Sequence, residues 1–126
     1  YSLLKQYKGE WEFDTNWKMI FGHPKKAGWI KAIQEAQQTV QKGLKLDCPI
    51  LVMSSNKSFP ETETWHEEYM TSDIVLDVQD IQKYGEKLGD KVTRDTIPNG
   101  IHDLILSQKP YRNDAYQTIF EWLKKQ

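Results

Sequence analysis

The feature that most constrains this chain is a short, continuously apolar run that follows a proline. Residues 50–53 read Ile-Leu-Val-Met, come directly after Pro49 and contain no polar residue. A run of this kind is typical of a strand covered on both faces, as in a parallel sheet. Such a strand needs neighbouring strands and covering helices, so the run predicts an α/β protein.

The rest of the chain predicts several helices but only one further strand. Apolar residues recur at helical spacing in three segments, 27–40, 78–88 and 111–123. The β-branched content of 91–97 indicates a second strand, nearer a sheet edge. We therefore predict the order helix, strand, loop, helix, strand, loop, helix. Two parallel strands rarely form a stable sheet alone, so we expect strand neighbours that this chain does not contain.

Length and composition exclude several classes of function. The 126 residues fit one domain or a large part of one, and 17 Lys and Arg balance 18 Asp and Glu to a net charge of −1. We therefore expect neither nucleic-acid binding nor a transmembrane segment, since no apolar run approaches the roughly 20 residues that cross a bilayer. The single cysteine, Cys48, is compatible with a cytoplasmic protein, and we interpret it as a buried, inert thiol.

Two loops can carry chemistry, because open α/β sheets place their sites after the carboxyl ends of the strands. The loop after the first predicted strand contains Asp73, and the loop after the second contains His102. A carboxylate beside an imidazole fixes its tautomer and stabilises the imidazolium, as general acid–base chemistry requires. The alternative is that His102 is a surface histidine and that Asp73 is a helix N-cap.

Three motifs together resemble the C-terminal portion of an α/β-hydrolase, in the lysophospholipase, monoglyceride-lipase and serine-aminopeptidase neighbourhood. They are Pro-Ile-Leu-Val-Met at 49–53, Ser-Asp-Ile-Val-Leu-Asp-Val at 72–78 and Ile-Pro-Asn-Gly-Ile-His-Asp-Leu at 97–104. The resemblance implies parallel strands flanked by helices. Residues 48–126 would form the C-terminal part of the hydrolase core, and residues 1–47 a cap-like, connecting segment.

The resemblance implies a serine hydrolase that cleaves carboxylic esters or amides through a Ser-His-Asp triad, without metal or organic cofactor. His102 would be the general base and Asp73 the acid that orients it. Asp77 and Asp103 compete for the acid role, although Asp77 better suits an N-cap of the helix at 78–88. The Gly-x-Ser-x-Gly elbow of the family is absent from this chain, so we expect the nucleophile outside it and the chain alone to be inactive.

Ser54 and Ser55 end the first predicted strand, and we expect them to make hydrogen bonds there rather than to act as nucleophiles. The chain begins at Tyr1 rather than Met, which leads us to expect a fragment.

Substrate binding is assigned to aromatic residues. The N-terminal third holds several of them and either lines an apolar pocket or anchors an irregular segment; they are Trp11, Phe13, Trp17 and Phe21. We take Trp17 and Trp65 as candidate substrate-binding residues for a small ester or peptide. The expected partner is the missing N-terminal part of the fold or a second chain. The alternative function is a non-catalytic α/β module that binds a protein or self-associates into a homo-oligomer.

Overall fold

The computed structural model describes residues 3–7, 9–19, 22 and 24–126. Within these residues, β1 (Ile50–Ser55) and β2 (Val92–Ile97) form a parallel sheet in which Ile50 lies opposite Val92. The same residues contain three α-helices: α1 (Ala27–Lys42), α2 (Val78–Gly85) and α3 (Lys109–Leu123). The predicted order of helices and strands is confirmed, and the chain is a mixed α/β protein.

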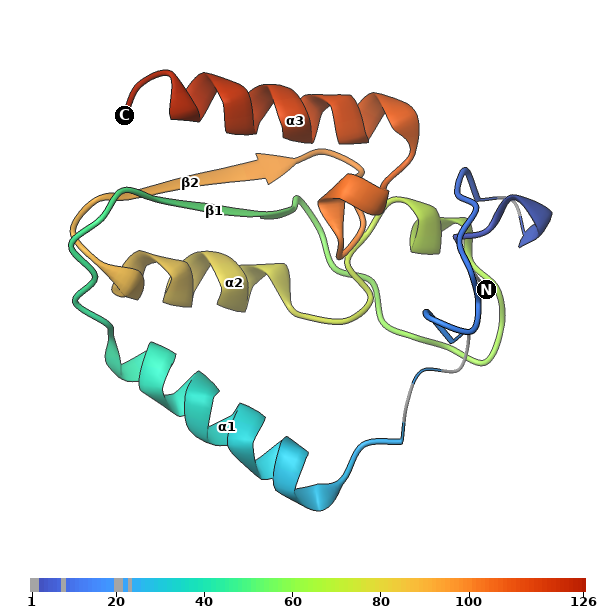
Figure 1. Ribbon diagram of the computed structural model, residues 1–126, viewed down its shortest axis with the longest axis horizontal. Helices are drawn as coiled ribbons and strands as arrows, with labels where there is room; N and C mark the ends of the chain where they lie inside the picture. Colours follow the sequence, from blue (N-terminus) through green and yellow to red (C-terminus); the bar gives the residue numbers. More distant parts are fainter. Residues whose placement is uncertain (1–2, 8, 20–21, 23) are drawn as a thin grey trace.

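Helices α2 and α3 lie on opposite faces of the sheet (Figure 1). Helix α2 packs tightly on β1, since a Cβ atom added at Gly85 would lie 2.8 Å from Val52 Cγ1. The helix then tightens into a 3₁₀ turn over Glu86–Leu88, so the predicted helix at 78–88 is helical throughout. On the other face, the indole of Trp122 in α3 donates a hydrogen bond to Thr93 Oγ1 of β2, at 3.2 Å.

Helix α1 lies beside α2 at a distance from the sheet (Figure 1). It ends at Lys42, and the next residue, Gly43, has a φ of 99°, a conformation that favours glycine. None of the residues of α1 is buried, and its apolar residues Trp29, Ile30 and Ile33 are exposed. The helix is therefore formed as its periodicity predicts, but its apolar face is not covered by the described part of this chain.

The outer edge of β1 is open in the described residues. Ile50 N donates to Lys91 O at 2.9 Å, so residues 50, 52 and 54 direct their backbone groups to β2. Leu51 and Met53 consequently direct theirs to the open edge. The side chains of residues 50–53 are only half-buried. Residues 50–53 are therefore less buried than a strand covered on both faces is expected to be, because no strand of the described residues adjoins the outer edge of β1.

The best-buried side chains gather where the strands end and not in the middle of the sheet. Several of them are polar. The buried apolar residues are Leu4, Val78, Ile97 and Ala115, and the buried polar residues are Ser54, Ser55, Ser72, Asp73 and Ser107. Residues 3–7 and 9–19 lie at this same end of the molecule (Figure 1). The core of the chain therefore surrounds the loops that carry Asp73 and His102.

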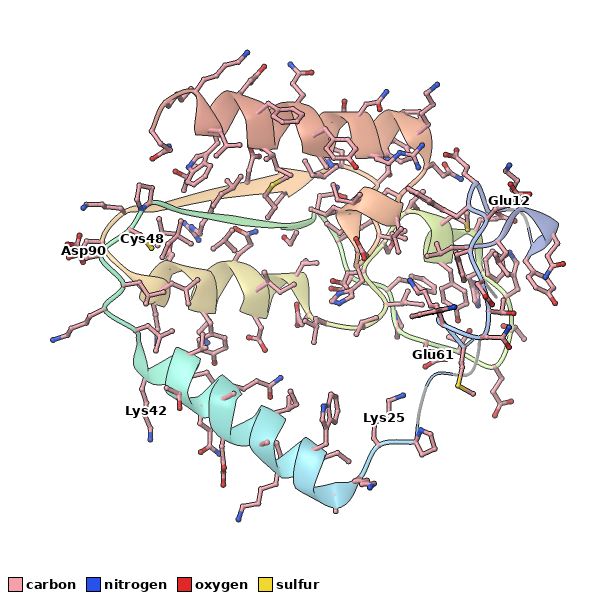
Figure 2. All side chains as sticks on the ribbon, in the orientation of Figure 1. Glu12, Lys25, Lys42, Cys48, Glu61 and Asp90 are labelled. Atoms are coloured by element: carbon pink, nitrogen blue, oxygen red, sulfur yellow. The ribbon has the colours of Figure 1, made fainter. Side chains whose placement is uncertain are left out.

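Cys48 lies at the opposite end of the sheet, beside the turn that contains Asp90 (Figure 2). It is a free cysteine and is exposed, so its interpretation as a buried thiol is wrong. The residue precedes β1 by one proline and does not reach the covered part of the strand. In the described segments, no helix is long and apolar enough to cross a membrane.

Candidate active site

Asp73 is held by its backbone and by its carboxylate. Its N–H donates to Lys57 O at 3.0 Å and its carbonyl accepts from Phe59 N at 2.9 Å, in a short bridge with the segment after β1. One carboxylate oxygen, Oδ1, accepts from the N–H groups of Val75 and Leu76 at 2.8 and 2.9 Å. An aspartate that caps the backbone two and three residues ahead forms a compact turn. This turn fixes the carboxylate, which is 1% exposed.

A tight turn leads from β2 to His102. Gly100 N donates to Ile97 O at 3.1 Å, and Asn99 has a φ of 58° after Pro98. Proline followed by a residue with positive φ is the pattern of a type II turn. Asn99 N also donates to Asn56 Oδ1 at 3.0 Å, which joins this turn to the loop after β1. Pro98, Asn99 and Gly100 thus form a turn that aligns the two loops of the site.

Ser107 closes the loop that carries His102. Its Oγ accepts a hydrogen bond from Ile101 N at 3.0 Å, and the residue is almost fully buried. Its carbonyl accepts from the guanidinium of Arg112 at 3.3 Å. Sequence reasoning did not identify Ser107, because a serine between a 3₁₀ turn and a helix carries no motif. Its role becomes visible only when the loop is folded back on itself.

The two loops bring Asp73 and His102 into direct contact. Asp73 Oδ2 and His102 Nδ1 lie 2.9 Å apart. A carboxylate can only accept a hydrogen bond, so Nδ1 carries the proton and the neutral ring presents its lone pair at Nε2. Within the described residues, Nε2 has no hydrogen-bond partner, and the His102 side chain is 42% exposed. This arrangement holds an imidazole as a base with one nitrogen available.

The other two candidate acids, Asp77 and Asp103, are not paired with His102. Asp77 Oδ1 accepts from Gln79 N at 2.8 Å and caps α2, as its position before the helix predicts. Asp103 adjoins His102 and precedes the 3₁₀ turn Leu104–Leu106, to which its carbonyl, not its carboxylate, is bonded. Of the three aspartates, the structure pairs Asp73 with His102.

The serines after β1 are occupied by structural hydrogen bonds. Ser54 Oγ donates to Ser55 O at 2.9 Å and accepts from Gln82 Nε2 at 2.8 Å. Ser55 Oγ accepts from Lys57 N at 3.4 Å. Ser58 Oγ donates to Leu76 O and accepts from Val78 N, each at 2.9 Å. The predicted strand-end role of Ser54 and Ser55 is confirmed.

Two hollows share His102 as a wall residue. The first, which we call the Trp11 cavity, has a volume of about 340 Å³ and lies between the N-terminal segment and the two site loops, with Trp11, Met70 and Leu106 in its wall. The second, the edge groove, has about 500 Å³ and is lined by Leu51, Met53 and Ile119. His102 therefore separates an apolar cavity from the groove beside the open edge of β1.

Neither aromatic residue assigned to substrate binding lines these hollows. Trp17 is 86% exposed and lies outside both walls. Trp65 is also absent from both walls, although its ring contacts Tyr69, which lines the Trp11 cavity, with centroids 5.3 Å apart. Trp11 lines the first of the two hollows. Phe13 contacts the Lys18 ammonium instead, and Phe21 lies outside the described residues.

Among the residues that the structure describes, no group of three or more His, Cys, Asp or Glu is arranged to hold a metal ion. No family model, no curated protein and no solved structure matches this chain. The chemistry of the site is therefore inferred from its own geometry.

Proposed function

We propose that this chain supplies the acid and the base of a serine hydrolase of the α/β-hydrolase type, which cleaves carboxylic esters or amides. The observation that carries the proposal is the 2.9 Å contact between Asp73 Oδ2 and His102 Nδ1. The pair lies on the loops that follow two adjacent parallel strands, which is where open α/β sheets place their sites. The three motifs that resemble the family include both residues.

In the proposed reaction, His102 Nε2 removes the proton of a serine hydroxyl as the serine oxygen attacks the substrate carbonyl. The imidazolium that forms is stabilised by the Asp73 carboxylate. It then returns the proton to the departing alcohol or amine, which leaves an acyl-enzyme. Water, activated by the same imidazole, hydrolyses that intermediate. These steps use no metal or organic cofactor, and we place the protein in the cytoplasm.

The proposed nucleophile lies outside this chain, on another part of the same fold or on a second chain. Two observations support this position: the open backbone edge at Leu51 and Met53, and the edge groove that these residues share with His102. A further parallel strand on this edge would end beside His102. The loop after such a strand would carry the serine to the free Nε2.

A fluorophosphonate probe tests where the nucleophile is. We expect residues 1–126 alone to remain unlabelled, because they contain no Gly-x-Ser-x-Gly elbow and because the hydroxyl groups of Ser54, Ser55 and Ser58 make structural hydrogen bonds. In the protein that contains this chain, we expect one labelled serine outside these residues, identified by peptide mass spectrometry. Stoichiometric labelling of any serine within 1–126 would contradict the proposed position of the nucleophile.

A second function, self-association, is favoured by the uncovered apolar surface. The edge groove leaves Leu51 and Met53 half-buried beside an unpaired strand edge, which is a template for pairing with another chain. Self-association needs no catalysis. If the chain forms a homo-oligomer, and neither it nor the protein that contains it reacts with fluorophosphonate, self-association is favoured over the hydrolase.

Sedimentation velocity over a range of concentrations measures this self-association. We expect residues 1–126 to form dimers or larger species, and we expect Met53→Lys to shift them to monomer, because a lysine beside the edge opposes strand pairing. Ile30→Lys, on the exposed face of α1, is the matched control and is expected to leave the assembly unchanged. A strictly monomeric chain would exclude this function.

A further inference from the structure

The Trp11 cavity is apolar and is bounded by parts of the chain that are far apart in sequence. Its wall includes Leu3 and Trp11 from the N-terminal segment, and Met70, Ile101 and Leu106 from the site loops. Cavities of about 150 Å³ lined by apolar side chains bind benzene, so about 340 Å³ has room for roughly a dozen heavy atoms. Its size and lining are those of a small-molecule site.

The N-terminal wall of the cavity is fixed in place by several contacts. Trp11 Nε1 donates to Leu106 O at 3.1 Å. The Glu10 carboxylate accepts from Lys109 N at 3.0 Å and from Arg112 Nη2 at 3.3 Å, at the start of α3. The Arg112 guanidinium also lies 4.7 Å from the centre of a Trp11 ring. The cavity is therefore preformed, which lowers the cost of ordering on binding.

The charges in the wall favour an uncharged ligand. Glu10 is paired with Arg112, and the charges of Lys18 and Asp103 in the wall are opposite in sign and offset each other. A charged ligand would therefore lose its hydration without meeting a net opposite charge. His102, in the same wall, is the one residue here that belongs to the proposed triad.

We infer that the Trp11 cavity binds an uncharged aliphatic chain of about a dozen heavy atoms, which packs against Trp11. That this chain is the apolar half of an ester substrate rests on the proposed hydrolase function. A substrate so placed has its apolar group beside Trp11 and its carbonyl beside His102. Either the acyl half or the alcohol half of an ester has this chemistry.

Calorimetric titration of residues 1–126 with straight-chain 1-alkanols tests the site without catalysis. We expect saturable 1:1 binding, with affinity rising about fourfold per added methylene group up to about decan-1-ol and then levelling off. The matching carboxylates are expected to bind more weakly. Absence of saturable binding, or tighter binding of the carboxylates, would overturn the inference.

Variants of wall residues test whether the alkanol binds in the Trp11 cavity. Trp11→Ala is expected to weaken binding of decan-1-ol at least tenfold, whereas Trp17→Ala, an exposed tryptophan of the same segment, is expected to leave it unchanged. Val75→Phe keeps the contacts of Trp11 and adds bulk at the cavity wall, so it should shorten the alkanol at which affinity levels off. Equal effects of Trp11→Ala and Trp17→Ala, or no effect of Val75→Phe, would exclude this cavity.

Turnover by the protein that contains this chain shows which half of the ester occupies the cavity. If the acyl half occupies the cavity, Trp11→Ala raises KM for ethyl decanoate and not for decyl acetate; the reverse result assigns the alcohol half. An equal rise for ethyl acetate, which is too short to fill the cavity, would contradict both. Alkanol binding, with no fluorophosphonate labelling of the protein that contains this chain, would refute the hydrolase alone. Labelling of that protein without alkanol binding would refute the cavity alone.

Discussion

His102→Ala is expected to lower ester turnover by about 10⁴-fold in the protein that contains this chain, with Asp73→Asn causing a loss of the same order. Alanine removes the base. Asparagine retains an oxygen that can accept from Val75 and Leu76 N–H, but its amide cannot hold Nδ1–H with a negative charge. The imidazole then loses both its fixed tautomer and the stabilisation of its protonated form. Initial rates with p-nitrophenyl acetate measure both losses.

Asp77→Asn is the matched control, because it removes one carboxylate close to the site. It is expected to keep turnover within a few-fold, since the Asp77 carboxylate caps α2 and does not pair with His102. Circular dichroism should show that Asp73→Asn retains the native fold. If Asp73→Asn kept full turnover and Asp103→Asn lost it, Asp103 would be the acid and the proposed pair would be wrong.

Ile97→Ala is expected to reduce the free energy of unfolding by about 2–5 kcal/mol, because it deletes most of a buried side chain and leaves a cavity. Ile97 is 2% exposed and ends β2 immediately before the turn that leads to His102. Urea denaturation followed by circular dichroism gives the change. The effect should be large because few apolar side chains are fully buried in the described part of the chain.

Ile30→Ala makes the same chemical change on the exposed face of α1, where Ile30 is 47% exposed. It is expected to alter the free energy of unfolding by less than about 0.5 kcal/mol, as surface substitutions usually do. Equal destabilisation by the two variants would mean that α1 is covered in solution and that the core is not centred on the strand ends.

The elements of this fold follow from short-range patterns and could therefore be predicted. The periodicity of α3, the apolar run of β1 and the Pro-Asn-Gly turn each depend on neighbouring residues. A contact between a carboxylate and His102 could be predicted, because the loops that carry Asp73 and His102 both follow parallel strands. The sequence alone left Asp77 as an alternative, and the two hydrogen bonds of Asp73 Oδ1 show why Asp73 is better held.

Features that depend on distant packing were not predictable. Cys48 lies next to an apolar strand in the sequence, as a buried thiol often does, yet it is exposed because it precedes β1 and does not reach the covered part of the strand. Trp11 and Trp17 lie in the same N-terminal stretch of the sequence and have similar neighbouring residues. Of the two, Trp11 is the one that contacts the site loops. Glu10 carries no motif, and its contact with Lys109 spans 99 residues of sequence.

The hydrogen bonds that join distant segments around the site also bear on the order of folding. Asn56 and Asn99 are 43 residues apart, and Asp73 and His102 are 29 apart. Contacts of such separation carry the loop-closure entropy of the whole intervening chain and are slow to form. The helices can arise early from local contacts, while the aspartate and the histidine meet only as the chain completes its fold. A partly folded molecule therefore holds no oriented imidazole and would have no hydrolytic activity toward its surroundings.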